Sequence, residues 1–257
     1  GELWQYSYDL SNRLVSVQTG KVGIASLQTV VSYTYDSRNL RIAAAHRDGT
    51  TYYEYDIKGN LIWREEAGTD GSVGSAGTGA VSGADDWSAS RYIYANGGIW
   101  AEERIRTAGD GSSAGGSAST NKTEVFYHHT DHLGTTEVIT NENGIVVWNA
   151  NYDVYGTVVS KIGTETFTPT FTCKQLDDAT GMYYFNARWY DSSLGRFITE
   201  DPARDGANWY AYCSNNPLKF VDPTGLEILS AATDIFMSQG KDTILGAGKT
   251  KIADEGC

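Results

Sequence analysis

The stretch Tyr53-Glu54-Tyr55-Asp56-Ile57-Lys58-Gly59-Asn60-Leu61 decides the fold class of this chain. Tyr53 and Tyr55 share one face of an extended backbone, because side chains along a strand alternate with a period of two. Asp56 then starts a turn, since its carboxylate can accept hydrogen bonds from nearby backbone N–H groups. The stretch therefore predicts a strand, a tight turn and the start of the next strand.

The same unit occurs twice upstream. Tyr6-Ser7-Tyr8-Asp9 precedes Asn12-Arg13-Leu14, and Tyr33-Thr34-Tyr35-Asp36 precedes Asn39-Leu40. Both turns carry an asparagine, which tolerates the left-handed backbone conformation that such a turn needs. Internal repeats of this length predict hairpins that stack on their neighbours and bury one face jointly.

The composition agrees with a chain made of strands and tight turns. Its 257 residues include 17 tyrosines, 7 tryptophans and 29 glycines, but only 4 prolines. Aromatic and glycine-rich sequences favour strands joined by turns, and this length can bury a sizeable core. The net charge of −12 argues against nucleic acid and against anionic membranes as partners.

Targeting signals and cysteines give little further information about the class of protein. The sequence has no apolar run of the roughly 18 residues that a membrane-spanning helix needs. It begins at Gly1 with neither Met nor a signal peptide, so we expect a piece of a longer protein. Cys173, Cys213 and Cys257 are an odd and low number, which favours buried free thiols over a Cys173–Cys213 bridge.

Two stretches rich in glycine and serine, 67–86 and 107–120, interrupt the strand pattern. Between them, Asn96-Gly97-Gly98 predicts a hairpin turn that joins strands 91–94 and 99–106. We therefore interpret both stretches as long hairpin loops. We expect them to pack on something, such as a neighbouring copy of the chain.

A cluster of His128, His129, Asp131 and His132 raises the hypothesis of a metal site, because imidazole and carboxylate suit zinc or similar ions. The spacing is poor, since His128 and His129 point to opposite faces of a strand. A hydrogen-bonded turn is the favoured interpretation, and a metal-dependent enzyme is the third-ranked function. We expect neither a metal nor a cofactor.

The Tyr-x-Tyr-Asp units resemble the Tyr-Asp (YD) repeats of Rhs and teneurin-type proteins. The stretch Tyr127–Gly134 and the later Tyr152–Gly156 are similar to the core region of Rhs proteins. The Rhs-associated core is matched by Asp177…Thr180-Gly181, Ala187-Arg188-Trp189-Tyr190-Asp191, Gly195-Arg196-Phe197, Asp201-Pro202, Asn215-Asn216-Pro217 and Asp222-Pro223-Thr224-Gly225-Leu226. Trp189 and Ser192 depart from the family pattern, which has tyrosine and proline there.

This resemblance implies an all-β fold: a spiralling antiparallel β-sheet of YD-repeat hairpins that forms a partial shell, with a short helical C-terminal segment. It divides the chain into YD-repeat hairpins (1–66), hairpins with the two Gly/Ser-rich loops (67–165), an Rhs-associated core cap (166–226) and a tail (227–257). The apolar run that starts at Ile228 is the part of the tail expected to be helical.

The resemblance also implies a reaction. In relatives that enclose a C-terminal toxin, the segment resembles an intramolecular aspartic protease that cuts after the leucine of Asp-Pro-x-Gly-Leu. If these roles apply to this chain, Asp201 and Asp222 are the carboxylate pair and Leu226–Glu227 is the scissile bond. Arg188 then holds the ionised aspartate through a bidentate pair. Two carboxylates held close together cannot both ionise cheaply, so one keeps a proton while the other activates water.

A purely structural, non-catalytic role of the same residues is the alternative interpretation. An aspartate before proline is an ordinary turn residue that can cap nearby N–H groups, and Arg188 could simply stack on tyrosine or tryptophan.

Two functions follow for the whole chain. The first is a fragment of a secreted or cell-surface Rhs/YD-repeat shell protein, whose core caps the shell and cuts itself after Leu226. Its partners would be the rest of a larger Rhs-type protein or other copies of itself, with a C-terminal toxin or tail as cargo. The alternative is a non-catalytic extracellular structural or adhesive protein that self-assembles through its repeats and loops.

Overall fold

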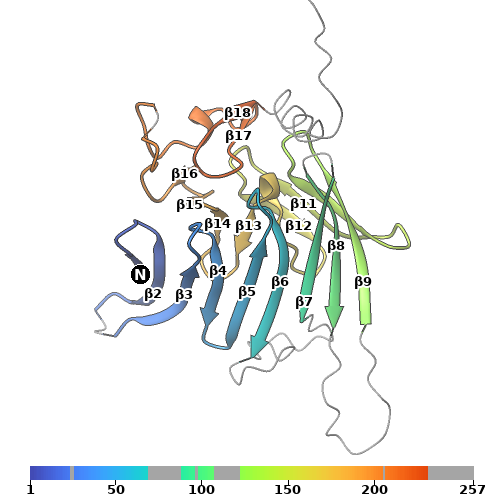
Figure 1. Cartoon of the computed structure of the whole chain (residues 1–257), viewed down its shortest axis with the longest axis horizontal. Coiled ribbons are helices and arrows are strands. Elements are labelled where there is room, and N and C mark those ends of the chain that lie inside the picture. Colours follow the sequence, from blue (N-terminus) through green and yellow to red (C-terminus); the bar gives the residue numbers. More distant parts are fainter. Residues whose placement is uncertain (24–25, 69–87, 96–97, 107–121, 205, 231–257) are drawn as a thin grey trace, which may run out of the picture.

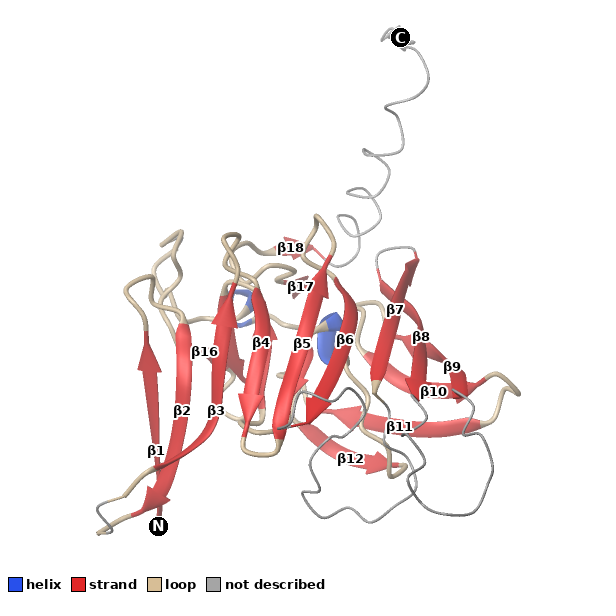
Figure 2. Ribbon diagram, turned by 60° about the horizontal axis from the view of Figure 1, so that its bottom comes forward, coloured by secondary structure: helices blue, strands red, loops and turns tan. Residues whose placement is uncertain are grey.

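The computed structural model describes residues 1–23, 26–68, 88–95, 98–106, 122–204 and 206–230. One antiparallel sheet of twelve strands contains the first part of the chain, with the strands in sequence order from β1 to β12. Figure 2 shows this sheet as a curved wall. The strands are β1 (Glu2–Tyr8), β2 (Leu14–Lys21), β3 (Gln28–Tyr35), β4 (Arg41–His46), β5 (Gly49–Tyr55), β6 (Leu61–Gly68), β7 (Ala89–Ala95), β8 (Gly98–Arg106), β9 (Lys122–Thr130), β10 (Thr136–Asn141), β11 (Val146–Tyr152) and β12 (Val158–Ile162).

The predicted aspartate turns form in each YD unit. One carboxylate oxygen of Asp56 accepts the N–H groups of Lys58 and Asn60 at 2.8 and 2.9 Å, and Asp9 and Asp36 do the same for their own turns. The left-handed position is taken by Asn12 (φ 60°), Asn39 (φ 65°) or Gly59 (φ 82°). Each turn is therefore specified within about five residues, which explains why the sequence reveals it.

Two smaller sheets follow the large one. The first contains β13 (Gln175–Asp177), β14 (Met182–Phe185), β15 (Arg188–Asp191) and β16 (Arg196–Phe197), and the second pairs β17 (Phe220–Val221) with β18 (Leu229–Ser230). They lie on the concave side of the large sheet (Figure 1). Both halves of the wall contact them: Tyr184 of β14 packs with Tyr55 of β5, and Tyr190 of β15 donates a hydrogen bond to the carbonyl of Tyr155 at 2.7 Å.

Arg41 fastens this inner layer to the large sheet. Its side chain is 1% exposed, and it reaches Asp177 Oδ2 at 3.0 Å and Gln175 Oε1 at 2.6 Å, both in β13. The guanidinium also lies 4.1 Å from the ring centroid of Tyr53 and 4.7 Å from that of Tyr184. A buried cation needs both charge pairing and hydrogen bonds, so these contacts fix the position of β13 against β4.

Three expectations about the chain as a whole have different outcomes: one is corrected, one falls outside the described residues and one is confirmed. Leu229 and Ser230 form β18, where we expected a helix to begin, because they pair with β17. The remainder of the predicted helix, residues 69–86 of the first Gly/Ser-rich stretch and all of the second lie outside the described residues, whereas Ala67 and Gly68 end β6 because they pair with β5. Cys173 and Cys213 are free thiols, as the low cysteine count favoured.

The large sheet runs through the first two of the four predicted segments, and the division of the chain into those segments stays a prediction. Among the described residues, no helix has the length and apolar character to cross a membrane.

We expect Arg41→Met to lower the free energy of unfolding by about 3–5 kcal/mol, because it leaves the buried carboxylate of Asp177 without its cation. Arg38→Met is the matched control, since Arg38 pairs with Asp36 at the surface and is 51% exposed. Its cost should stay below about 1 kcal/mol. Urea unfolding followed by tryptophan fluorescence measures both, and equal losses would contradict the role of Arg41.

Candidate functional site

The structure brings Arg188, Asp201 and Asp222 together from three separate parts of the inner layer. Arg188 is the first residue of β15, Asp201 follows β16, and Asp222 directly follows β17. Arg188 Nη2 lies 3.0 Å from Asp222 Oδ2, and Nη1 lies 3.3 Å from Asp201 Oδ2. All three residues are buried. The guanidinium thus contacts both carboxylates once, in place of the bidentate pair with one carboxylate that we expected.

The remaining contacts of Arg188 fix its orientation. Its Nε donates a hydrogen bond to the carbonyl of Gly225, and Nη1 donates to the carbonyl of Trp209 at 3.2 Å. The guanidinium also stacks on Phe197, 3.7 Å from the ring centroid. Arg188 therefore makes the ion pairs that the catalytic hypothesis predicts and also the aromatic stacking that the structural alternative predicts. Its aromatic partner is a phenylalanine, where we expected tyrosine or tryptophan.

Asp222 lies directly against the expected scissile bond. Its Oδ1 accepts the N–H groups of Thr224 (3.3 Å), Gly225 (2.7 Å), Leu226 (3.1 Å) and Glu227 (3.3 Å). The last of these is the nitrogen of the Leu226–Glu227 peptide. One carboxylate oxygen therefore accepts four successive backbone N–H groups of this turn. The last of the four belongs to the nitrogen that would become the leaving amine.

The carbonyl groups of the same turn are held from outside. Those of residues 223–225 accept hydrogen bonds, in order, from Lys174 Nζ (2.5 Å), Ala187 N (3.1 Å) and Arg188 Nε (2.5 Å). Within the part of the chain that the structure describes, no donor contacts the carbonyl of Leu226. That residue is 39% exposed. The three carbonyl groups that precede Leu226 are thus each held by a donor from outside the turn.

Burial sets the proton affinity of this site. It raises the pKa of Asp222 above the ordinary range of an aspartate, against the lowering effects of Arg188, of the Gly225 and Leu226 amides, and of Lys174. It also lowers the pKa of the Lys174 ammonium. Asp222 therefore keeps a proton at a higher pH than an exposed aspartate would.

Sequence reasoning missed Lys174, Phe197 and Ala187. Phe197 lies in the Gly-Arg-Phe motif and Ala187 in the Ala-Arg-Trp-Tyr-Asp motif, so both could have been found from the resemblance. Lys174 carried no signal beyond being a lysine before a predicted strand. Cys213 also lies close enough to interact electrostatically with Arg188 and Asp222, and burial raises the pKa of its thiol to about 12.

The histidine cluster does not converge. His128 is buried and its Nε2 lies 3.6 Å from Glu102 Oε2, whereas His129 is exposed. Asp131 Oδ1 accepts the N–H groups of Leu133 and Thr135, which repeats the aspartate turn of the YD units. Residues 122–204 and the other described segments contain no cluster of three or more His, Cys, Asp or Glu that could hold a metal ion.

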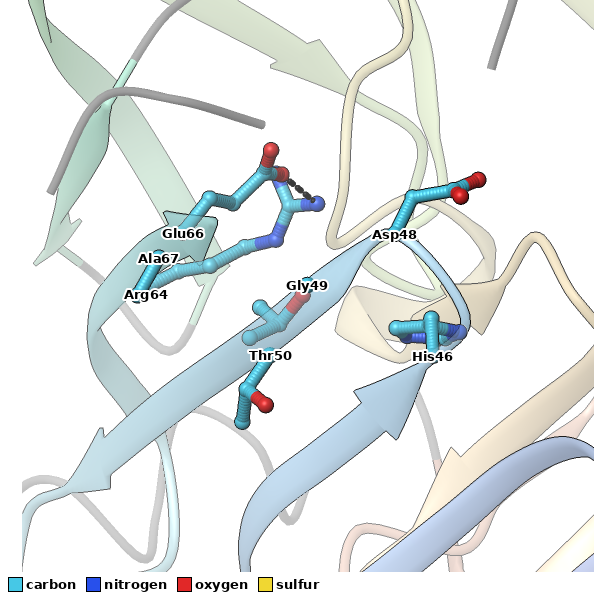
Figure 3. Close-up of a pocket in the computed structure, with 8 residues that line it drawn as sticks. His46, Asp48, Gly49, Thr50, Arg64, Glu66 and Ala67 are labelled. Carbon is cyan, nitrogen blue, oxygen red and sulfur yellow. Dashed lines mark ion pairs between the residues drawn. The ribbon is translucent and has the colours of Figure 1, made fainter. Parts of the chain in front are cut away.

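A separate open hollow of about 190 Å³ lies beside β4, β5 and β6. Figure 3 shows His46, Asp48, Arg64 and Glu66 among the residues that line it, with an ion pair between Arg64 and Glu66. None of the lining residues belongs to the arginine–aspartate cluster. Since Arg64 is already paired with Glu66, the hollow presents no free charge from this pair to a ligand.

Comparison with known proteins gives matches over most of the chain. A family described as "RHS protein" matches residues 125–162. The "Double-stranded DNA deaminase toxin A" of Burkholderia cenocepacia is 30% identical over 240 residues, which is 86% of this chain and 15% of that protein. The "tRNA3(Ser)-specific nuclease WapA" of Bacillus spizizenii is 27% identical over 243 residues, which is 85% of this chain and 10% of that protein.

Among solved structures, one titled "Crystal Structure of TcdB2-TccC3 without hypervariable C-terminal region" aligns with 87% of this chain and 13% of its own, at 17% identity and a TM-score of 0.45. The chain thus spans only 15%, 10% and 13% of these three matched chains.

Within the turn of residues 222–227, Gly225 leaves no room for a larger side chain. Its φ is +74°, and a Cβ atom there would lie 2.4 Å from the carbonyl oxygen of Phe185. Gly181 has φ +70° but nothing within 4 Å of such a Cβ, so it isolates the backbone cost. We expect Gly181→Ala to lower the free energy of unfolding by about 1–2 kcal/mol.

Gly225→Ala should cost about 1–3 kcal/mol more, because the added methyl group forces β14 and β15 to move. Chemical denaturation of the two variants gives the difference directly. Equal costs would mean that the turn does not pack against Phe185 as described.

Proposed function

The chain belongs to the Rhs/YD-repeat family, and from this membership we propose that it forms part of the wall of a secreted or cell-surface β-shell, capped by residues 166–226, that cuts itself after Leu226. The observation that carries the cleavage is the position of Asp222. Its carboxylate contacts the Glu227 nitrogen on one side and Arg188 on the other.

The relatives support a carrier role for this part of the protein. Two of them bear names for different activities, DNA deamination and tRNA cleavage, yet both match about the same share of this chain. An activity that differs between two proteins does not arise from the part that they share. We therefore assign to this chain the enclosure and release of a C-terminal cargo, and place the cargo's own activity elsewhere in the full-length protein.

The proposed reaction is hydrolysis of the Leu226–Glu227 peptide bond. Asp201 takes a proton from a water molecule, whose oxygen attacks the carbonyl carbon of Leu226. Asp222 reacts in its protonated form, in which Oδ1 carries the proton. As the C–N bond breaks, the Glu227 nitrogen becomes pyramidal, its N–H turns away from Oδ1, and its lone pair takes that proton. The products are a carboxyl group on Leu226 and an amine on Glu227, and Arg188 stabilises whichever aspartate is ionised.

Intramolecular positioning supplies a large part of the proposed rate enhancement. The bond belongs to the same chain as the carboxylates, and Lys174, Ala187 and Arg188 hold the carbonyls that precede it. Holding reacting groups in place removes much of the entropic cost of bringing them together. A single turnover per chain is all that such a site has to perform.

The non-catalytic alternative has one observation in its favour. Asp222 caps its own turn through one oxygen, which is the device that Asp9, Asp36 and Asp56 use in the YD turns. Under this alternative the chain is an extracellular structural or adhesive protein, and the cluster only closes the inner layer. The two functions differ in whether the Leu226–Glu227 bond breaks.

Asp201→Asn and Asp222→Asn should each slow self-cleavage at least ~100-fold, because each removes a proton-transfer group. Asp153→Asn is the matched control, since Asp153 caps the turn between β11 and β12 through the N–H groups of Tyr155 and Thr157. It should cleave like the parent chain. A gel time course with N-terminal sequencing at Glu227 provides the readout, and cleavage that persists in both asparagine variants would refute the aspartic mechanism.

The cleavage rate should fall as the pH rises through the pKa of Asp222, because the proton on Asp222 is the one transferred. Because burial raises the pKa of Asp222 above the ordinary aspartate value of 3.8, the decrease in rate should occur above that pH. Lys174→Met removes a charge that lowers this pKa, so the fall should move to higher pH, whereas Lys174→Arg should leave it in place. A pH–rate profile unchanged in Lys174→Met would exclude the electrostatic coupling between Lys174 and Asp222.

A further inference from the structure

The scissile bond lies in the loop of a small hairpin whose two strands belong to opposite sides of the cut. Strand β17 precedes the bond and stays with the core, whereas β18 follows it and leaves with the downstream fragment. The two pair antiparallel, with Phe220 opposite Ser230 and Val221 opposite Leu229. Figures 1 and 2 show β17 and β18 side by side at the edge of the inner layer.

Leu229 is the side chain through which β18 contacts the core. It packs against Val221 of β17 and Leu133, which lies in the aspartate turn between β9 and β10. Val221 is 4% exposed and Leu133 is 7% exposed, so they form an apolar surface from both the inner layer and the wall. Ile228, one residue earlier, is 42% exposed. Ile228 directly precedes β18 and is not part of the apolar cluster, so Leu229 is the one of the two that contacts the core.

We propose that β17 and Leu133 form a binding site for the segment that follows the cut. The site takes an extended peptide with an apolar side chain at the third residue after the cleaved bond, which is Leu229 here. This inference rests on the proposed cleavage after Leu226. Strand pairing supplies recognition of the backbone, and the pocket for the alternate side chain supplies the sequence preference.

The site has two consequences for the reaction. Before the cut, it anchors the downstream side of the loop, just as Lys174, Ala187 and Arg188 anchor the upstream side. The bond is then fixed at both ends, which favours attack. After the cut, the same pairing keeps the new amine at Glu227 beside the core, so release of the fragment is a separate step from cleavage.

The test compares Leu229→Asp with Ile228→Asp, which introduces the same charge next to it on the exposed face. Leu229→Asp should slow cleavage by roughly 10-fold or more, because a carboxylate replaces a packed apolar side chain. It should also allow the downstream fragment to separate from residues 1–226 on size exclusion. Ile228→Asp should cleave and retain the fragment like the parent chain, and Leu229→Met should do so too. Equal behaviour of the two aspartate variants would overturn the site.

Failure of the proposed cleavage gives a different result. If the parent chain stays intact, amide hydrogen exchange in the intact chain still tests the site. Leu229→Asp should then speed exchange at the one of the Leu229 and Ser230 amides that points to β17, while Ile228→Asp leaves it unchanged. If neither of these two amides is protected from exchange in the parent chain, the binding site is refuted independently of any cleavage.

Discussion

A guanidinium taken out of water must be paired, and this chain meets that requirement by joining parts of the sequence that lie far apart. Arg41 in β4 pairs with Asp177 in β13, which fixes the inner layer to the wall. Arg104 in β8 pairs with Glu165, which fastens the segment after β12 to the same wall. Arg188 completes the series inside the inner layer. Because an unpaired buried charge is strongly destabilising, each pair disfavours arrangements that separate the segments it joins.

The third arginine differs from the other two in what its carboxylates touch. Asp177 also accepts hydrogen bonds from Thr180, in a local turn, and its position accounts for its role in the fold. Asp222 also holds a local turn, and in addition it contacts the amide of Glu227, beyond the end of the Asp-Pro-x-Gly-Leu motif. A second carboxylate, Asp201, shares the same guanidinium. Arg104 also pairs with two carboxylates, those of Glu102 and Glu165, so the feature particular to Arg188 is that one of its carboxylates contacts the amide of the Leu226–Glu227 bond.

The sequence predicted the parts of this fold that depend on local chemistry. The turn of each YD unit is specified by one aspartate and an asparagine or glycine within a few residues, so the successive hairpins followed directly. The cluster of Arg188, Asp201 and Asp222 was foreseen only through the family resemblance, because nothing in their spacing brings them together. Lys174 and Leu133 were missed, since each contributes through contacts between distant segments. The prediction of a helix in the tail was wrong at Leu229, because this residue pairs with β17 despite the apolar composition that suggested a helix.

Mass spectrometry of the purified chain after incubation at acidic pH in water enriched in oxygen-18 tests the central claim most directly. Hydrolysis by the proposed site predicts two species. One ends at Leu226 with one oxygen-18 atom in its new carboxyl group, and the other begins at Glu227. An intact chain, or a break at any other bond, would contradict the account.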